Sequence, residues 1–546
     1  MPDRIFSAPR ALLAGLVAVG CTSASLEGTA QASSVLEFPD NGSEQLGRGG
    51  AWVARASDPL AAFYNPAGLA GQDTRFLLNA NVVFSHTCFS RVKSNIDQQQ
   101  EPAAPDGVHF PRVCNDISPF LNPQLAMTYK INDRMGAGFA FLGPSAAGEA
   151  NFPTFVNSAN GPQPAPQRYM EVYSNTFLVT PTIAFGAEVA DNLRLGASFQ
   201  WGIVKAKFVN STLAINGDNQ AAGTNDIQST LIVHDYFVPG FTLGGIYTIA
   251  DQFDIAGWYK WSDTIKASGD VYSQTPFYTK DVANGKTSGI YDGDTSQRDC
   301  GFGGSTTVCG NGDNAKVHIS IPMEAKIGFR YHKPRGEVRK HHRDPLHDDT
   351  FDAEVDLTWA NNSSFDTIQV RFPGDANGNG IIPVNGAAGG TVPPNDDVPH
   401  RFKDVYGVRI GGDYNLLPDQ LALRGGAYYE SKGQDNKYQN VDYAGASRAG
   451  LAAGATYRVR LDREKTKALE FSLGFMHVFY MNEDNNDPTG TGLRAIAGTT
   501  CNPDTASLAG GTCANGVQKY RTNWPINLGT ITNSVNVINV GANYRF

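Results

Sequence analysis

Charged side chains recur at every second position in two segments of the chain that are close in sequence. Paired carboxylates of this kind could perform acid–base catalysis. Antiparallel pairing of the two segments would instead place Arg330 near Asp352 and Lys326 near Asp356, as ordinary opposite-charge pairs across a sheet, and we favour this interpretation. The charged residues concerned are Glu324, Lys326, Arg330, Asp352, Glu354 and Asp356.

Three arginines further along the chain are candidates for binding an anionic group. Arg409, Arg458 and Arg460 fall on the polar side of alternating segments, where one of them could meet a substrate carboxylate. No Gly-x-Ser-x-Gly, HExxH or phosphate-loop motif occurs in the chain. We therefore predict that the protein is not an enzyme and that it holds no bound cofactor.

Two segments have the composition of a metal site. Residues 341–349 read HHRDPLHDD, but they lie in a polar connection and we interpret them as a solvated turn. Residues 375–380 match the first half of a calcium loop, yet Gly386 stands where the bidentate glutamate should be. An Asn-Gly turn is the alternative there, so we predict no metal site and leave calcium in this loop open.

The elements that carry these residues alternate apolar and polar side chains with a period of two, which is typical of β-strands. In residues 319–332 the odd-numbered positions form the apolar face, and residues 351–359 repeat the pattern. Residues 535–546 alternate as well and end on Phe546. In a soluble sandwich such a face forms a core, whereas in a membrane barrel it faces lipid.

The connections between the segments favour the barrel. Short polar turns, such as 132–133, 191–192, 251–252 and 418–419, alternate with long connections, such as 89–118, 269–315 and 482–533. Outer-membrane barrels show this asymmetry, with short turns at the periplasmic end and long loops outside. The fold class is therefore all-β, an antiparallel barrel of about 14 strands. The strand register within 192–268 is not fixed by the sequence, so a count of 12 or 16 strands is also open.

Composition agrees with this class. The chain has 546 residues, 41% of them hydrophobic, a formal net charge of −9 and 59 glycines, and its mean hydropathy is −0.30. The longest apolar run, residues 11–20, is too short for a membrane-spanning helix, which needs about 20 residues. The acidic balance argues against a nucleic-acid partner.

Residues 1–32 read as a secretory signal peptide, with Arg4 and Arg10 ahead of an apolar stretch and a small-x-small cleavage site before Ser33. Lipoprotein processing at Cys21 is the alternative. Cleavage before Ser33 leaves six cysteines. Six cysteines allow many connectivities, and proximity favours the pairs 88–114, 300–309 and 501–513, which require an oxidising compartment.

Residues 33–72 do not alternate, and we predict that they form a plug, or hatch, ahead of a barrel spanning 73–546. Asp58 can cap a short helix that starts at Pro59, and Asn65-Pro66 then interrupts it. Gly71 allows a sharp exit into the first strand. Short, kinked helices ahead of a large barrel are what a folded plug requires.

The stretch around 46–51 and the sequence DPLAAFYNPAGLA at 58–70 resemble the FadL/TodX family of outer-membrane transporters for long-chain fatty acids and other hydrophobic compounds. The resemblance implies a hatch held by Asn65, Pro66 and Ala67 together with Gly49 and Gly50. It also implies that residues 33–38 lie near the ligand and move when it binds. The substrate-binding residues stay unknown.

The resemblance further implies passive diffusion of hydrophobic molecules, with lateral release at a kink in the third strand, residues 134–145. Gly143-Pro144 is the candidate kink, and the alternative is that it only ends the strand at its loop. Apolar residues 152–156 could capture ligand or simply pack the loops. A structural, adhesive or porin-like barrel and a lipid-modifying enzyme are the alternative functions.

The expected partners follow from this assignment. They are a hydrophobic ligand, outer-membrane lipids and the barrel-assembly machinery, which would recognise Phe546, in the outer membrane of a Gram-negative bacterium. We expect a monomer.

Overall fold

The computed structural model describes residues 40–93, 107–117, 119–143, 148–158, 161–215, 226–274, 279–281, 286–288, 313–336, 341–376, 381–383, 391–392, 395–462, 467–487, 492–497 and 519–546. The predicted signal peptide, residues 33–38, Pro144, most of the candidate calcium loop and the cysteine pairs 300–309 and 501–513 lie outside these residues. Within the described ranges, no helix is long and apolar enough to cross a membrane.

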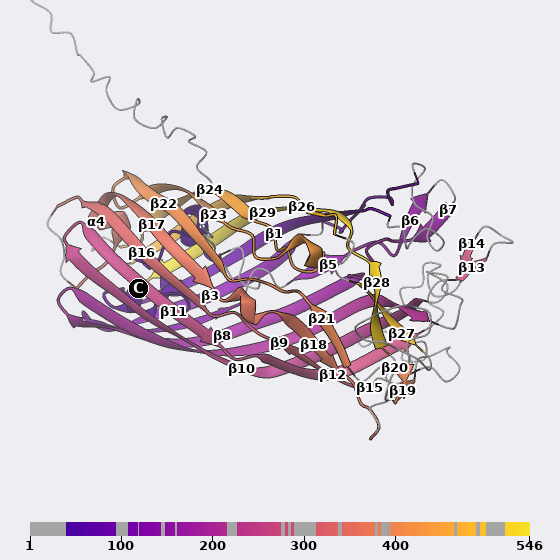
Figure 1. Ribbon diagram of the computed structural model, residues 1–546. Helices are drawn as coiled ribbons and strands as arrows, with labels where there is room; N and C mark the ends of the chain where they lie inside the picture. The colour runs from indigo at the N-terminus through magenta and orange to yellow at the C-terminus, as the bar shows by residue number, and fades with distance from the viewer. Residues whose placement is uncertain are drawn as a thin grey trace, which may run out of the picture.

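The described strands close into an antiparallel barrel (Figure 1). Each wall strand pairs with its neighbours in the chain, and β1 pairs with β29 from Arg75↔Arg545 to Arg91↔Gly529, which closes the ring. The wall has 14 strands, as the alternation predicted. They are β1 (Arg75–Arg91), β3 (Phe120–Asn132), β4 (Met135–Leu142), β8 (Tyr173–Ala190), β9 (Leu193–Ile215), β10 (Asp226–Ala250), β11 (Phe253–Ser262), β16 (Glu324–Pro334), β17 (Asp349–Ala360), β22 (Val405–Leu417), β23 (Leu421–Glu430), β24 (Arg448–Arg460), β25 (Ala468–Tyr480) and β29.

The predicted short turns join the strands at one end of the barrel, for instance between β3 and β4 and between β8 and β9. At the other end several wall strands continue into an upper wall. Its strands are β12 (Ile265–Gln274), β15 (Asp313–Ile319), β18 (Thr367–Arg371) and β21 (Asn395–Pro399). We call the two ends the short-turn end and the long-loop end.

The remaining elements are short. The strands are β2 (Val113–Cys114), β5 (Glu149–Asn151), β6 (Phe155–Ser158), β7 (Gly161–Pro164), β13 (Thr279–Asp281), β14 (Lys286–Ser288), β19 (Ile382–Pro383), β20 (Thr391–Val392), β26 (Glu483–Asn485), β27 (Gly492–Ala497) and β28 (Lys519–Pro525). The helices are α1 (Ser43–Gly47), η1 (Pro59–Ala62), η2 (Pro66–Leu69), α4 (Pro345–Asp348), η4 (Asn362–Ser364) and η5 (Asn436–Tyr438).

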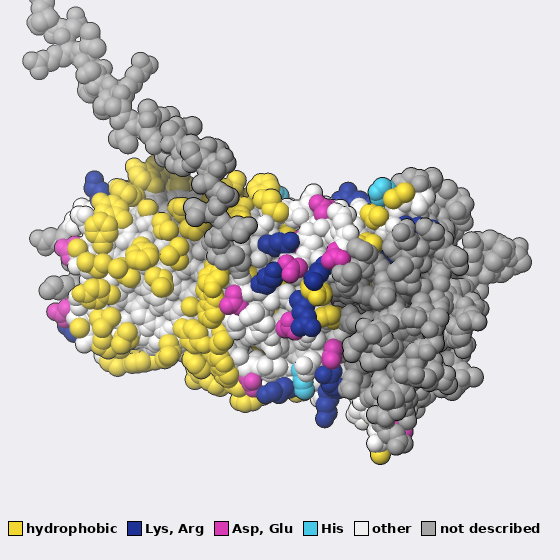
Figure 2. All heavy atoms as spheres, viewed as in Figure 1, with side chains coloured by type: hydrophobic (Ala, Val, Ile, Leu, Met, Phe, Trp, Pro, Cys, Tyr) yellow, Lys and Arg dark blue, Asp and Glu magenta, His cyan; other side chains and the backbone are white. Residues whose placement is uncertain are grey.

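Side chains on the outer face of the wall are apolar, and those on the inner face are polar. In β17, Val355 and Leu357 are exposed while Glu354 and Asp356 are fully buried. On the face shown in Figure 2, exposed apolar side chains gather on the half of the barrel nearer the short-turn end, and we call this zone the apolar belt. The prediction of a lipid-facing apolar surface is therefore met by the arrangement of the side chains.

One face assignment was wrong. Below the break at 320–323 the odd-numbered residues of β16 face outward as predicted, with Ile327 about half exposed. Ile319, above the break, is buried. Pro322 lies in this break, where regular strand structure stops, so the side-chain alternation of β15 does not continue into β16.

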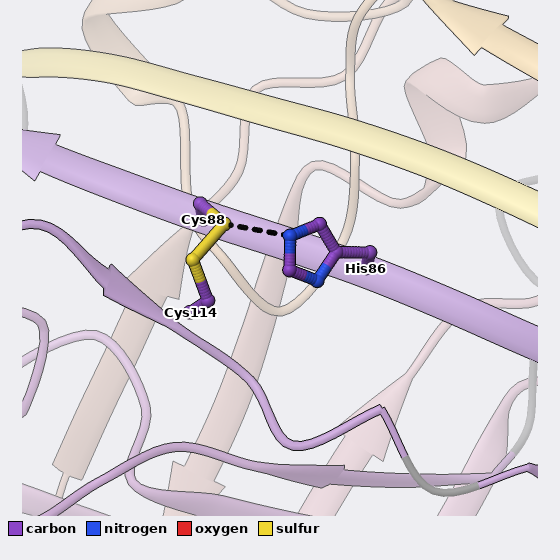
Figure 3. A group of neighbouring side chains, drawn as sticks. All are labelled: His86, Cys88 and Cys114. Atoms are coloured by element: carbon purple, nitrogen blue, oxygen red, sulfur yellow. Dashed lines mark hydrogen bonds between the residues drawn. A yellow bond between two sulfur atoms is a disulfide. The ribbon is translucent and has the colours of Figure 1, made fainter.

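The disulfide Cys88–Cys114 joins β1 and β2 at the long-loop end, as sequence proximity predicted. Figure 3 shows His86 beside it, with Nε2 3.1 Å from the Cys88 sulfur. A buried apolar cluster next to this bridge contains Phe89, Val113 and Phe152. Phe152 is 1% exposed, which favours the loop-packing interpretation of residues 152–156 over ligand capture.

Candidate functional site

Residues 40–72 lie inside the barrel. Nearly all of them are buried, and their contacts go to wall strands on opposite sides of the ring. Helix α1 packs against β23, β24, β25 and β29, whereas η1 and η2 pack against β3, β4, β8, β9 and β10. This inner segment therefore spans the barrel from wall to wall.

Local signals in the sequence shape the inner segment. Asp58 caps η1, since its carboxylate accepts the Leu60 N–H at 2.7 Å, and Asn65 caps η2 through the Ala67 N–H at 3.3 Å. Gly71 leaves the segment at φ +82°, which permits the turn into β1. Gly49 has φ +65° and lies so close to β23 that a Cβ there would meet the Ala427 nitrogen at 2.8 Å.

One side of the inner segment is charged and meets the carboxylates of β17 and β22. Arg48 donates to Asp352 at 2.6 Å, to Asp413 at 2.8 Å and to Glu354 at 3.2 Å. Arg55 donates to Asp352 and Asp413 from the other side, at 2.5 Å and 3.0 Å. Buried charges of this kind are stable only when they are paired, and here each carboxylate has a guanidinium partner.

The carboxylates of β17 also hold the backbone of the inner segment. The N–H groups of Trp52 and Val53 donate to Asp356 at 2.8 Å and 3.2 Å, and the Ala54 N–H donates to Glu354 at 2.6 Å. The predicted pair Arg330–Asp352 is present at 2.9 Å. The predicted pair Lys326–Asp356 was wrong.

Lys326 bonds to Asp40 instead, at 3.4 Å. The register differs from the predicted one by two residues, with Arg330 opposite Glu354 and Lys326 opposite Thr358, so Arg330 reaches Asp352 diagonally whereas Lys326 turns to the inner segment.

The pKa values of two acidic groups of the inner segment are shifted in opposite directions. Burial would raise the pKa of Glu44, but Arg55, Arg424 and Arg48 outweigh it and lower the pKa to about 2. Burial and the neighbouring charge on Glu44 raise the pKa of Asp58 to about 8. At neutral pH the segment therefore carries one ionised and one protonated carboxyl side by side.

The opposite side of the inner segment is apolar. A buried cluster joins Leu60, Phe63 and Leu69 of the segment to wall residues such as Ala140 and Ile246. Small wall residues make this approach possible, since a Cβ at Gly138 would meet the Ala62 Cβ at 2.8 Å. The segment thus has a fixed orientation, with its charges toward β17 and β22 and its apolar side toward β4 and β8.

The described part of β4 ends one residue before Gly143, which is compatible with a kink at Gly143-Pro144 and with a strand that ends at its loop. Strand β4 ends at Leu142, and β5 resumes at Glu149 on the same neighbour, β8. The first five residues of β3 pair with β1 but with neither β4 nor β5. A Cβ at Gly143 would meet the Leu178 carbonyl oxygen at 2.1 Å, so the chain passes very close to β8 here.

Asn41 of the inner segment bonds directly to Gly143, at the end of β4. Its Nδ2 donates to the Gly143 carbonyl at 3.0 Å, and Asn122 of β3 donates to the same oxygen at 3.1 Å. The Asn41 Oδ1 accepts from Asn122 at 3.0 Å and from Gln124 at 2.9 Å. One buried carboxamide thus joins the inner segment, β3 and the end of β4.

The short-turn end is covered by residues 341–349, which we call the basal strap. The Asp344 carboxylate is 2% exposed and binds Arg458 and Arg545, while the Arg343 N–H donates to the Gly71 carbonyl at 3.0 Å. Leu346 is 6% exposed. The prediction of a solvated turn was therefore wrong, because interior charges hold this connection against the barrel base.

The three candidate arginines all have partners. Arg409 binds Asp40 and Glu430, Arg458 binds Asp344 and Glu470, and Arg460 binds Asp419. Each guanidinium is already engaged by carboxylates of the protein, so none offers a free binding site for a substrate carboxylate.

Two groups of side chains in the described residues have metal-like spacing. His86, Cys88 and Cys114 form one, but both sulfurs belong to the disulfide. Glu188, Asp191 and His341 form the other, and the Arg134 guanidinium, 2.5 Å from Asp191, already supplies a cation there. Neither group requires a metal ion.

The partners of the inner segment could not be found from the sequence. Asn41 and Arg48 have no motif around them that predicts their contacts, and their partners in β3, β17 and β22 lie 81 to 365 residues away in the chain. Alternation did identify Asp352 and Glu354 as inward-facing. That much was a usable signal.

The fold is a closed antiparallel barrel with a membrane-type apolar outer face and a segment of the chain inside it. The chain matches the model of the outer membrane protein transport protein family (OMPP1/FadL/TodX) over residues 24–500. It therefore belongs to this family. The family's proteins are transport channels, in line with the prediction that the chain is not an enzyme.

Solved structures show the same fold. A FadL homologue from Pseudomonas aeruginosa superposes with a TM-score of 0.61 at 17% identity, covering 95% of this chain and 100% of that one. The toluene transporter TbuX from Ralstonia pickettii gives a TM-score of 0.53 at 14% identity, covering 94% and 99%. The toluene transporter TodX from P. putida gives 0.52 at 13% identity, with the same coverage. A search of curated proteins found no match.

Proposed function

We propose that this protein carries long-chain fatty acids or other hydrophobic small molecules inward across the outer membrane of a Gram-negative bacterium, by passive diffusion and with lateral release. The observation that carries the proposal is the place beside Gly143, where β4 ends and the first five residues of β3 pair with neither β4 nor β5. It lies beside the apolar side of the inner segment. The similarity to a FadL homologue and to toluene transporters supports this substrate class.

The sideways route is proposed because the straight route along the barrel axis is obstructed. We infer that the inner segment, which contacts opposite walls, and the basal strap at the short-turn end block a straight path along the axis. Burial of an alkyl chain gains roughly 0.8 kcal/mol per CH₂ group. Sideways exit into the bilayer keeps that gain, whereas exit into the periplasm returns the chain to water.

In this proposal residues 33–72 act as the hatch. Asn65, Pro66 and Ala67 hold one end of it beneath β8, β9 and β10, where a Cβ at Gly196 would meet the Ala67 nitrogen at 2.4 Å. Gly49 and Gly50 allow the other end to lie against β22 and β23. The protein works as a monomer in contact with outer-membrane lipids, and Phe546 serves as its signal to the barrel-assembly machinery.

The test is uptake by cells that lack the native gene and express variants of this protein. Asn122→Trp places a large ring beside Gly143, and we expect uptake of labelled oleate or toluene to fall at least tenfold. Asn536→Trp makes the same change on the outward face of β29 and should leave uptake unchanged. Equal uptake by both variants, with both present as folded barrels, would contradict lateral release at Gly143.

Conductance separates this proposal from a porin-like barrel. A chain whose interior is filled should give no stable, large open channel in a planar bilayer. Such a channel would overturn the hatch. Normal uptake of all hydrophobic compounds by the deletion strain would favour an adhesive or structural role instead.

A further inference from the structure

On the side formed by β10 to β22, the wall has a line of breaks in regular strand pairing, which we call the crease. Five neighbouring strands lose regular pairing at one level, where the upper wall begins. The Asp263 N–H bonds to the Pro239 carbonyl at 2.9 Å and the Asn361 N–H to the Met323 carbonyl at 2.8 Å, which keeps the two parts joined. The interrupted stretches are 236–237, 263–264, 320–323, 361–366 and 400–404.

The crease marks the edge of the apolar belt. Trp201, Tyr236 and Phe237 lie beside it, about half exposed or more, and the Trp201 Nε1–H donates to the Tyr236 carbonyl at 2.6 Å. Aromatic girdles of this kind lie at the boundary between hydrocarbon and head groups. Beyond the belt, basic and acidic side chains gather on the surface (Figure 2). The upper wall therefore stands at head-group level.

Two basic side chains face each other on the outside of this upper wall. Val317 of β15 and Val370 of β18 are paired and buried on the inner side, so their neighbours Lys316 and Arg371, also paired, point outward. Like charges directly opposite each other on a sheet destabilise it. Arg371 has Asp397 at 2.6 Å, but Lys316 has no ion-pair partner among the described residues.

A polar pocket of about 500 Å³ lies next to this pair, in the crease. Hydroxyl and amide groups line it, together with an imidazole, a guanidinium and the carboxylates of Asp366 and Asp397. Arg401 adopts a left-handed backbone conformation with φ +51°, which residues other than glycine rarely adopt. Its N–H donates to the Asp366 carbonyl at 2.9 Å. The lining includes Thr264, His318, Ser320, Ser364, Gln369 and Arg401.

We propose that this pocket, together with the Lys316–Arg371 pair, binds the phosphorylated sugar head group of an outer-leaflet glycolipid. A phosphate between Lys316 and Arg371 would relieve their repulsion, and a phosphate is a strong partner for a guanidinium. The hydroxyl and amide groups of the pocket match a sugar ring. The site stands just above the aromatic edge, which is where such a head group begins.

Acidic side chains on the same surface do not exclude this occupant. Asp263, Asp366 and Asp397 pair with Lys266, Arg401 and Arg371. All these pairs are exposed to solvent, where ion pairs contribute little, so the basic groups can exchange a carboxylate for a phosphate.

The test is native mass spectrometry of the purified barrel with lipid A as the probe. We expect the protein to retain one lipid A and the double variant Lys316→Glu/Arg371→Glu to retain at least tenfold less. The matched control Lys130→Glu/Arg134→Glu makes the same change at the short-turn end and should retain it normally. Unchanged retention by the first variant would overturn the proposal.

Two further arms define the ligand. Lipid A without its phosphates should be retained at least tenfold less than the intact lipid. Phosphatidylglycerol retained as well as lipid A would overturn the assignment to a glycolipid and leave a general anionic-lipid surface. If the double variant fails to fold, as judged by heat-modifiable migration, Lys316→Gln alone should still lower retention severalfold.

Discussion

Asn41 donates a hydrogen bond of 3.0 Å to the carbonyl of Gly143, which joins the interior of the barrel to the end of β4. Asn122 of β3 donates to the same carbonyl at 3.1 Å and to the Asn41 Oδ1 at 3.0 Å. The inner segment, β3 and the end of β4 are thus one hydrogen-bonded unit.

Replacing Asn41 by alanine should loosen this unit. The Gly143 carbonyl keeps only Asn122, and Gln124 loses an acceptor, so the free energy of unfolding should fall by about 1–3 kcal/mol. Hydrogen–deuterium exchange should quicken at 120–124 and 141–143. Asn192→Ala, in an exposed turn, is the control and should change neither quantity.

Gly143→Ala should disturb the wall at the same point. The added Cβ would meet the Leu178 carbonyl oxygen at 2.1 Å, a backbone atom that cannot move without shifting β8. We expect a marked loss of folded barrel in the outer membrane, measured by heat-modifiable migration. Gly425→Ala meets nothing closer than the Ala452 oxygen at 3.8 Å, so it should fold normally. Equal folding of the two variants would show that the close approach is not needed.

Arg48→Ala should be among the most destabilising changes in the inner segment. It leaves Asp352, Glu354 and Asp413 short of a cation in a buried site, and breaking a buried pair in this way costs about 3–5 kcal/mol. Urea unfolding in detergent micelles would measure the loss. Arg401→Ala removes an exposed ion pair and should cost less than about 1 kcal/mol. A small loss for Arg48→Ala would mean that water enters the site.

The loops at the long-loop end should loosen as pH rises. Burial, and then the charge on Asp442, raise the pKa of Glu171 to about 8. Because the folded-state pKa lies above the unfolded value, the contribution of this group is complete at acid pH and is lost as pH rises through about 8. Protease cleavage near 165–172 should therefore increase between pH 6 and pH 9. In Glu171→Gln that increase should disappear.

Removing the disulfide should affect the loop and not the wall. The bridge closes a loop with a sequence separation of 26, for which chain entropy predicts about 3–4 kcal/mol. Cys88→Ser/Cys114→Ser should make residues 107–117 sensitive to trypsin, which can cut after Arg112. The heat-modifiable migration of the barrel should stay the same. A change in barrel folding would show that this bridge supports the wall as well.

The wall could be predicted from the sequence because its rule is local. A strand with water on one side and lipid on the other must alternate, and Val355 and Glu354 show that it does. The rule failed at Ile319, because the break around Pro322 changes parity without changing the composition on either side. Breaks of this kind are set by pairing with distant strands.

The interior could be predicted only in part. Asp58 caps its helix as expected, because a cap needs only the next two or three residues. Asn65, expected only to interrupt that helix, also caps the next one. The basal strap was misread because its partners, such as Arg458 and Arg545, come more than 100 residues later. Charge density alone does not tell a solvated turn from a docked one.

The basal strap also has a consequence for assembly. Its Asp344 binds Arg545, which sits in the last strand directly opposite Arg75 of the first, and Arg545 also binds Asp73 just before that strand. The basal strap, which comes from the middle of the chain, therefore stabilises the pairing of β1 with β29 that closes the sheet. Final closure of the ring and docking of the strap should then occur as one cooperative event, late in biogenesis.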